Sequence, residues 1–392
     1  MALEPIFTFH DAQWALYIVL MQLPLILKPS PYRPLFFVPI LALTAYTAYS
    51  TKGRFLDDYY VNLQWFNYLW VASDLILLTD VQRELRQVPL RHPGDKNGIE
   101  HTSLWRRICW GNSLFFSPRG VGWAHEPTDS LPPHPPADLS RTRFVLQRLR
   151  SAAIFFLIHD ACNLHVRWNP MYWPDGPGYR TSGWIWRLVA TASWGLSAAT
   201  MMCLLFTIIS IVAVGSGLSN PSAWPAFMGS PRDAYTVRRF WGRTWHQNMR
   251  RFVSAHGRRL VQALNLKRGS NASAYTQLYV AFLISAIIHY IPEVIAMRSW
   301  HGGAFIFFTA QALAITCEDF VIWLGRRAGL ESEWWCYVGY LTTWMWFALT
   351  LPVWQEPLVR RGLMTEGVPV SVIAGVWKGQ WVLPPFSSVY TK

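Results

Sequence analysis

Residues 279–297 read YVAFLISAIIHYIPEVIAM, an apolar run that contains His289 near its middle and then Pro292 and Glu293. A helix of about 20 apolar residues is long enough to cross the hydrocarbon core of a bilayer, which is roughly 30 Å thick. Because backbone groups in lipid have no water to bond, such a span is expected to be helical. The stretch therefore predicts a helical membrane protein with an ionisable side chain inside one span.

The composition of the whole chain favours the same class. Of its 392 residues, 52% are hydrophobic, yet the formal net charge is +13, so apolar bulk and positive charge must occupy different places. Runs that are suited to spans of about 20 residues, two of them short, occur at 12–27, 34–50, 64–80, 151–165, 185–215, 275–297, 303–325 and 334–355. The brief run at 368–377 is either re-entrant or a further tilted span. We therefore expect an all-α, polytopic membrane bundle of about 8–9 transmembrane helices with cytosolic amphipathic helices.

Lysine and arginine collect in two segments, and by the positive-inside rule these segments are cytosolic. Residues 81–150 are expected to form a cytosolic loop insertion, and residues 216–274 a cytosolic basic and amphipathic segment. Residues 275–355 then hold the histidine-bearing helix and the spans that follow it. All of them belong to a single integral membrane domain, 1–392, whose first span acts as an uncleaved anchor.

The basic segment contains a second informative stretch, WPAFMGSPRDAYTVRRFWGRTWHQNMRRF, at 224–252. Apolar side chains recur there at steps of three and four residues between positions 237 and 252, which favours amphipathic helices at the membrane interface. The arginines around His246 are suited to the phosphates of an anionic co-substrate. Contact with anionic lipid headgroups, or a role in membrane topology alone, stays open as an alternative. These arginines are Arg238, Arg239, Arg243, Arg250 and Arg251.

His289 is the strongest catalytic candidate. It lies about 14 residues into its span, which is roughly 21 Å along a helix that rises 1.5 Å per residue. An ionisable side chain at that depth is a functional candidate by default. A neutral imidazole can take the proton of a hydroxyl that attacks a carbonyl, and burial favours the neutral form. The structural alternative is a histidine that bonds neighbouring helices, and Glu293, on the same helical face, can orient it or line a substrate tunnel.

A resemblance to a known family rests on several stretches. WPAFMGSP at 224–231 and FWGRTWHQ at 240–247 resemble the motif of the wax synthase-like branch of the membrane-bound O-acyltransferase family. RGVGW at 119–123 and FLIHD at 156–160 are similar to further elements of its fungal terpenoid and meroterpenoid O-acetyltransferases. His289 falls where the family keeps its span histidine.

The resemblance implies transfer of an acyl group, expected to be acetyl, from acyl-CoA to the hydroxyl of a hydrophobic alcohol such as a terpenoid. It implies acetyl-CoA as co-substrate, no permanently bound cofactor, and a multi-pass location in the endoplasmic reticulum. His289 would be the general base and His246 the second catalytic residue. Either His246 or the indole N–H of Trp241 or Trp245 would stabilise the oxyanion. Residues expected at the co-substrate are Arg238, Arg239, Trp241, Arg243, Trp245 and Arg250. Residues expected at the acceptor are Glu293, Asp160 and Trp224.

Other functions stay open beside this one. A long-chain wax ester synthase would keep the mechanism and change the acyl group, whereas a membrane-integral terpene cyclase would need a carboxylic acid such as Glu318 or Asp319. A transporter is disfavoured because no inverted repeat is visible. His159, Asp160 and His165 do not share one helical face, so no metal site is expected. The expected partners are acyl-CoA, the hydrophobic alcohol and membrane lipid, without nucleic acid.

Overall fold

The structure is a computed structural model that describes residues 9–88, 98–364 and 367–384. Over these ranges the chain forms helices and turns, with two isolated β-bridges and no strand. Apolar runs without the alternating pattern of a half-buried strand produce this outcome. The all-α class expected from the sequence is confirmed.

The chain divides into two compact units, each made of two stretches. Unit 1 comprises residues 1–127 and 248–296, and unit 2 comprises residues 128–247 and 297–392. The sequence predicts one integral membrane domain, and that remains a prediction.

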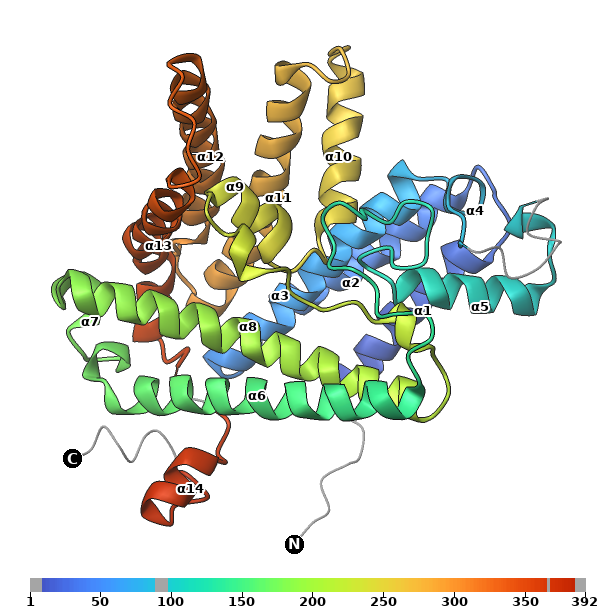
Figure 1. Cartoon of the computed structure of the whole chain (residues 1–392). Coiled ribbons are helices and arrows are strands. Elements are labelled where there is room, and N and C mark those ends of the chain that lie inside the picture. The colour runs from blue at the N-terminus through green and yellow to red at the C-terminus, as the bar shows by residue number, and fades with distance from the viewer. Residues whose placement is uncertain (1–8, 89–97, 365–366, 385–392) are drawn as a thin grey trace, which may run out of the picture. The chain divides into compact units, whose positions relative to one another are not determined.

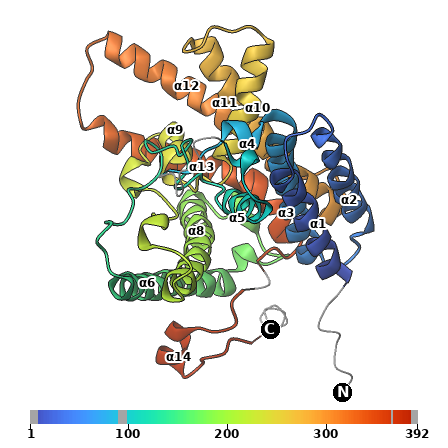
Figure 2. The same ribbon diagram turned by 90° about the vertical axis from the view of Figure 1, so that its right-hand side faces the viewer.

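The described part of unit 1 contains six main helices, with short helical turns between them, and their arrangement can be followed in Figures 1 and 2. They are α1 (Phe9–Ile26), α2 (Phe37–Ser50), α3 (Phe55–Ala72), α5 (Leu104–Phe115), α10 (Arg250–Ala263) and α11 (Asn271–Met297). A π-helical turn, Ser73–Leu78, continues α3, and the one-turn helix α4 (Val81–Glu84) follows it. Tyr17 of α1, Ile40 of α2 and Trp65 of α3 are almost fully buried together, so aromatic and branched side chains form the core here.

Helices α10 and α11 run side by side and are joined by a short turn (Figure 1). Gly257 permits this close approach, because a Cβ atom there would lie 3.1 Å from the Cα atom of Gln277. Phe252 packs with Ile284 and Ile288 in a buried cluster between the two helices. The face of α11 that precedes His289 is therefore fixed against α10.

Unit 2 is built on a pair of long helices, α6 (Arg141–Trp168) and α8 (Trp184–Gly215), which lie side by side in both views (Figures 1 and 2). The short α7 (Gly178–Thr181) lies between them in the chain. The other elements are α9 (Val237–Arg239), a π-helical turn at Phe240–Thr244, α12 (Ala304–Arg327), α13 (Trp335–Arg360) and α14 (Val372–Lys378). Gly303 lets the start of α12 approach α13, because a Cβ atom there would lie 1.8 Å from the carbonyl oxygen of Val353.

The carboxyl-terminal segment 367–384 is docked on α6. The side chain of Asp160 accepts the backbone N–H of Ile373 at 2.9 Å, and the side-chain amide of Asn163 donates to the carbonyl of Val368 at 3.0 Å. Arg167 donates to the carbonyl of Pro384 at 2.7 Å. A bridge between Val370 and Val382 closes the segment on itself, and α14 lies within this loop. With seven residues, α14 is too short to cross a bilayer alone.

Among the described residues, three helices are both long and apolar enough to cross a membrane, namely α8, α11 and α12. The other expected spans coincide with helices α1, α2, α3, α6 and α13, which are shorter, more polar or only partly described. The count of eight or nine spans therefore remains a prediction.

The apolar stripe between 237 and 252 does not form one amphipathic helix. The one-turn α9 and the π-helical turn end at Thr244, and a new helix, α10, begins at Arg250. Trp245 has an extended backbone conformation, with a ψ angle of 156°, so the helical path is interrupted between Thr244 and Arg250. Amphipathic character is realised in α10, whose buried residues are Phe252, Ala255, Gly257 and Val261.

Candidate active site

The FWGRTWHQ stretch folds into a tight turn within unit 2. The backbone N–H of Trp245 donates to the carbonyl of Phe240 at 2.8 Å, which closes the π-helical turn. The side-chain amide of Gln247, which is buried, donates to the carbonyls of Trp241 and Trp245. The last residue of the motif thus fixes the backbone on either side of His246.

The preceding Gly-Ser-Pro stretch is fitted to this turn. The N–H of Gly229 donates to the carbonyl of Thr244 at 2.9 Å, and the hydroxyl of Thr244 donates to the carbonyl of Ser230 at 3.1 Å. A Cβ atom at position 229 would lie 1.9 Å from the carbonyl oxygen of Arg243, so only glycine fits. The two halves of the motif are therefore one packed structure.

His246 is half-buried within a row of aromatic rings. Its ring centroid lies 6.0 Å from that of Phe227 and 5.5 Å from that of Trp245. Phe206 of α8 extends the row, with centroids 5.1 Å from Phe227 and 5.2 Å from Trp224. The structure thus brings His246, Trp245 and Trp224 together along one aromatic wall.

The arginines of this segment are engaged with carboxylates. Arg238 forms two side-chain hydrogen bonds with Asp319, one of them from Nε at 3.0 Å, and Arg239 pairs with Asp233. Arg243 lies 4.0 Å from Asp233, at the limit of an ion pair. The positive charge near His246 is thus partly balanced inside unit 2.

Glu318 and Asp319 have structural contacts at the same place. The carboxylate of Glu318 accepts the backbone N–H groups of Val237 at 3.1 Å and Arg238 at 3.3 Å, which caps the first turn of α9. Asp319 holds the guanidinium of Arg238. Both carboxylates therefore organise the start of the FWGRTWHQ turn.

Gln311 contacts the candidate site and was not singled out by the sequence analysis. It is fully buried on α12, and its Oε1 atom accepts the indole N–H groups of Trp346 at 2.9 Å and Trp241 at 3.4 Å. This bond directs the Trp241 N–H toward α12. The sequence feature that could have identified Gln311 is its amide side chain within the apolar run 303–325. Polar residues inside membrane spans are uncommon and usually form hydrogen bonds.

His289 and Glu293 lie one helical turn apart on α11, which belongs to unit 1. Arg250, at the start of α10, belongs to the same unit. His289 is half-buried with its Nδ1 atom inaccessible to solvent, and Glu293 is completely buried. Helix α11 continues through Pro292 to Met297. His246 belongs to unit 2.

The remaining two acceptor candidates both have contacts in unit 2. Asp160 uses one carboxylate oxygen for the N–H of Ile373, and its Oδ1 atom is buried without a hydrogen-bond partner. Trp224 donates its indole N–H to the hydroxyl of Ser219 at 3.0 Å and accepts a hydrogen bond from Arg148 at its carbonyl. The described residues form no group of three or more His, Cys, Asp or Glu side chains that could hold a metal ion.

The RGVGW stretch forms a turn in unit 1. Gly120 and Gly122 have φ angles of 72° and 76°, which favour glycine, and the N–H of Trp123 donates to the carbonyl of Gly120 at 2.9 Å. Trp123 is buried against Trp110. The side chain of His125 closes over Gly120, where a Cβ atom would lie 3.0 Å from its ring.

The sequence matches a known family. The model of the membrane-bound O-acyl transferase family matches residues 224–310, which include the FWGRTWHQ turn and His289. Acetyltransferase ple2 of Rhodocybe pseudopiperita is 37% identical over 96% of this chain and 98% of its own length. Acetyltransferase eriL of Hericium erinaceus is 35% identical over 90% of this chain and 92% of its own.

A more distant relative carries a different name. O-Mevalon transferase macI of Penicillium terrestre is 28% identical over 69% of this chain and 64% of its own length. No solved structure matches the chain.

The length and level of these similarities define the class of protein: the chain belongs to the membrane-bound O-acyltransferase family. It is a membrane-integral enzyme that transfers an acyl group from a donor to a hydroxyl of an acceptor.

Proposed function

We propose that the enzyme transfers an acetyl group from acetyl-CoA to a hydroxyl of a hydrophobic terpenoid or meroterpenoid alcohol, with His289 as general base. The observation that carries this proposal is the position of His289, half-buried on a helix suited to cross the membrane and inside the family match. Two relatives that match almost the whole chain are named acetyltransferases, which supports the small acyl group.

The proposed reaction is a direct transfer. His289 removes the hydroxyl proton of the acceptor while the oxygen attacks the thioester carbonyl. The tetrahedral intermediate then collapses and expels the CoA thiolate. The thiolate accepts the proton from the His289 imidazolium and leaves as the free thiol. His246 or the indole N–H of Trp245 would stabilise the oxyanion, whereas the indole N–H of Trp241 is bonded to Gln311.

The co-substrate is proposed to meet the cationic segment around the FWGRTWHQ turn. Arg243 is the best placed of its arginines, since it is exposed and its ion pair with Asp233 is long, at 4.0 Å. Arg238 and Arg239 would have to exchange their carboxylate partners for phosphates, and Trp241, Trp245 and Arg250 complete the proposed contacts. Glu293, Asp160 and Trp224 remain the proposed acceptor contacts.

The proposed setting is a multi-pass topology of eight or nine spans in the endoplasmic reticulum, with the donor on the cytosolic side. Acceptors that partition into the bilayer would then approach His289 from the membrane. This arrangement separates a charged donor from an apolar acceptor, as the segregation of charge in the chain suggests.

The proposal is tested by product analysis. Microsomes that contain the enzyme would be incubated with acyl-CoAs from acetyl to palmitoyl and with terpenoid and fatty alcohols, and the esters measured by mass spectrometry. We expect an acetyl ester that falls by about 10²–10⁴-fold in His289→Ala. His301→Ala, which alters an exposed histidine outside the helices, is the matched control and should retain full activity.

Two outcomes would contradict parts of the proposal. Long-chain esters without acetyl esters would remove the acetyl assignment and retain the mechanism. Full activity of a well-folded His289→Ala enzyme, judged by its elution in detergent, would remove His289 as the base.

A further inference from the structure

The unpaired positive charge of unit 1 lies beyond the segment that the sequence emphasises. Arg251 is engaged with Asp74 at 3.1 Å. Further along, four exposed cations, which we call the basic tip, occur within eleven positions. They are Arg258, Arg259, Lys267 and Arg268. Their side chains form no hydrogen bond or ion pair with any described residue.

The turn that carries the basic tip is well built. Asn265 adopts a left-handed conformation with a φ angle of 52°, and its N–H donates to the carbonyl of Gln262 at 3.1 Å. The N–H of Leu266 reaches back to the carbonyl of Val261 at 3.0 Å, which completes a Schellman motif at the end of α10. Ser270 then caps α11 by accepting the N–H of Ser273 at 3.2 Å.

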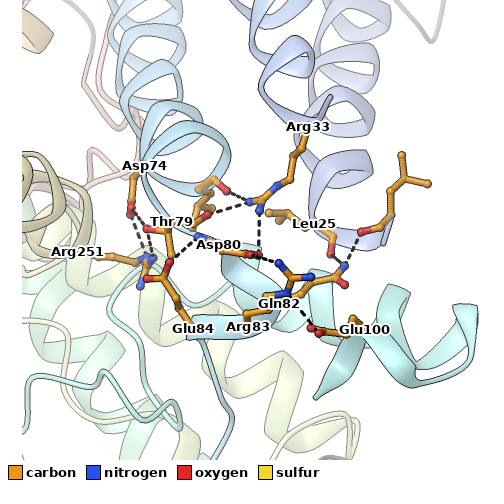
Figure 3. Close-up of polar contacts among 12 residues, drawn as sticks. Leu25, Arg33, Asp74, Thr79, Asp80, Gln82, Arg83, Glu84, Glu100 and Arg251 are labelled. Carbon is orange, nitrogen blue, oxygen red and sulfur yellow. Dashed lines mark hydrogen bonds and ion pairs between the residues drawn. The ribbon is translucent and has the colours of Figure 1, made fainter. Parts of the chain in front are cut away.

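The base of α10 is anchored to the carboxyl-terminal end of α3 and its π-helical turn. Figure 3 shows Arg251 reaching Asp74 and Thr79, and the Arg251–Thr79 distance is 3.5 Å. The ring of His256 lies 2.9 Å from the hydroxyl of Ser73. Beyond these anchors, the exposed side of α10 carries Arg258 and Arg259 on an ordered scaffold.

The surroundings of the basic tip point to a membrane surface. It comes directly before α11, which is suited to cross the bilayer. Leu260 and Leu264, 40% and 55% exposed, lie between its cations, so apolar and positive side chains share this surface. Four or more cations next to a span are typical of contact with anionic headgroups, while adjacent leucines suit the acyl boundary.

We propose that the basic tip binds the phosphate-bearing headgroups of anionic phospholipids. Charge complementarity supplies the attraction, and the Schellman turn presents Lys267 and Arg268 together with the pair on α10. Each cation near an anionic surface contributes enough binding free energy to change affinity by about 5-fold. The basic tip shares no residue with the FWGRTWHQ turn and does not include His289, and the proposal does not depend on which acyl group is transferred.

The test uses the full-length protein in nanodiscs of phosphatidylcholine with increasing phosphatidylserine. Retained phosphatidylserine is counted by native mass spectrometry. Arg258→Gln/Arg259→Gln is expected to weaken its binding by about 10-fold or more, with smaller losses at high salt. The charge-matched control is Arg326→Gln/Arg327→Gln, an exposed pair at the end of α12. An equal loss in both variants would mean that net charge alone binds the lipid, which would overturn the site.

A second variant tests whether a change at this turn disturbs folding, and a second measurement tests whether the cations bind the acyl donor. Asn265→Gly preserves the left-handed turn and every cation, so it should retain lipid binding. The KM for acetyl-CoA in pure phosphatidylcholine should be unchanged in Arg258→Gln/Arg259→Gln. A raised KM with unchanged lipid binding would assign the cations to the phosphates of the donor instead, and would overturn the proposal.

Discussion

Arg238 illustrates how one side chain can be misjudged from its neighbours in the chain. It lies in a run of arginines, yet its guanidinium is bound by Asp319, which is 81 residues away in the sequence. An arginine and a carboxylate form two parallel hydrogen bonds, which direct the side chain as well as neutralising it. Arg238 therefore orients the turn that holds His246, and only a folded chain reveals this.

His125 is a second residue whose surroundings determine its chemistry. Both ring nitrogens are buried without a hydrogen-bond partner. Burial, followed by the positive charges of Arg251 and Arg258, lowers the pKa of His125 from 6.5 to about 4. The folded protein thus prefers the neutral ring, whereas the unfolded chain would be protonated below about pH 6.5.

This shift predicts a pH-dependent stability. The free energy of unfolding is not reduced by His125 above about pH 6.5, where the ring is neutral in both states. It decreases as the pH falls from 6.5 toward 4, because the unfolded state then binds a proton that the folded state does not. Allowing for partial exposure, we expect a loss on the order of 1 kcal/mol, or about 2–4 °C in Tm. Thermal unfolding at pH 7 and pH 5 measures it. The decrease should shrink in His125→Gln, and an identical decrease in that variant would contradict the assignment.

At the scale of the element, the close approach of α10 to α11 depends on the small size of Gly257. Gly257 faces Gln277 so closely that a Cβ atom would lie 3.0–3.2 Å from three of its atoms, including the Cα atom. The backbone of α11 cannot move away as a flexible side chain would. The pair that includes the catalytic candidate helix is therefore sensitive to the size of this residue.

Gly257→Val is expected to destabilise unit 1 by about 1–3 kcal/mol, because overpacking forces helices apart. Differential scanning fluorimetry of the detergent-solubilised enzyme measures the change. Gly325→Val is the matched control, since Gly325 is also helical and a Cβ atom there would meet no atom within 4 Å. Equal melting temperatures for the Gly257→Val protein and the wild type would refute the contact.

Much of the helical framework could be predicted from the sequence. Apolar runs at 185–215, 275–297 and 303–325 correspond to α8, α11 and α12, because length and hydrophobicity are local properties. The break after Thr244 could not be predicted, since the side-chain amide of Gln247 and a close glycine contact create it. For the same reason the sequence predicts His246 and Trp241 as candidates but gives no sign that Gln311 bonds Trp241, because the two partners of Gln311 come from other segments.

At the scale of the whole molecule, the orientation of the chain in the membrane is open to direct test. The distribution of lysine and arginine predicts that 81–150 is cytosolic and that 166–183 is lumenal. Cys109 and Arg180 are both exposed and lie in these two segments. They can therefore report opposite faces.

A membrane-impermeant maleimide should label Cys109 in sealed microsomes. In a Cys109→Ser background, Arg180→Cys should be labelled only after the vesicles are opened. Labelling of both positions in sealed vesicles would place them on the same side and contradict the predicted arrangement of spans. Gel-shift analysis of the purified chain gives the result directly.

The docked carboxyl-terminal segment has a consequence for biosynthesis. Asp160 precedes its partner Ile373 by 213 residues. At roughly 5–20 residues per second, its carboxylate waits about 10–40 s during translation before that partner is made. Helices α6 and α8 are therefore complete in the growing chain before the segment that docks on α6 has been made. A chain that ends before Ile373 would lack the N–H group that this carboxylate accepts, and the side of α6 that binds the carboxyl-terminal segment would stay uncovered.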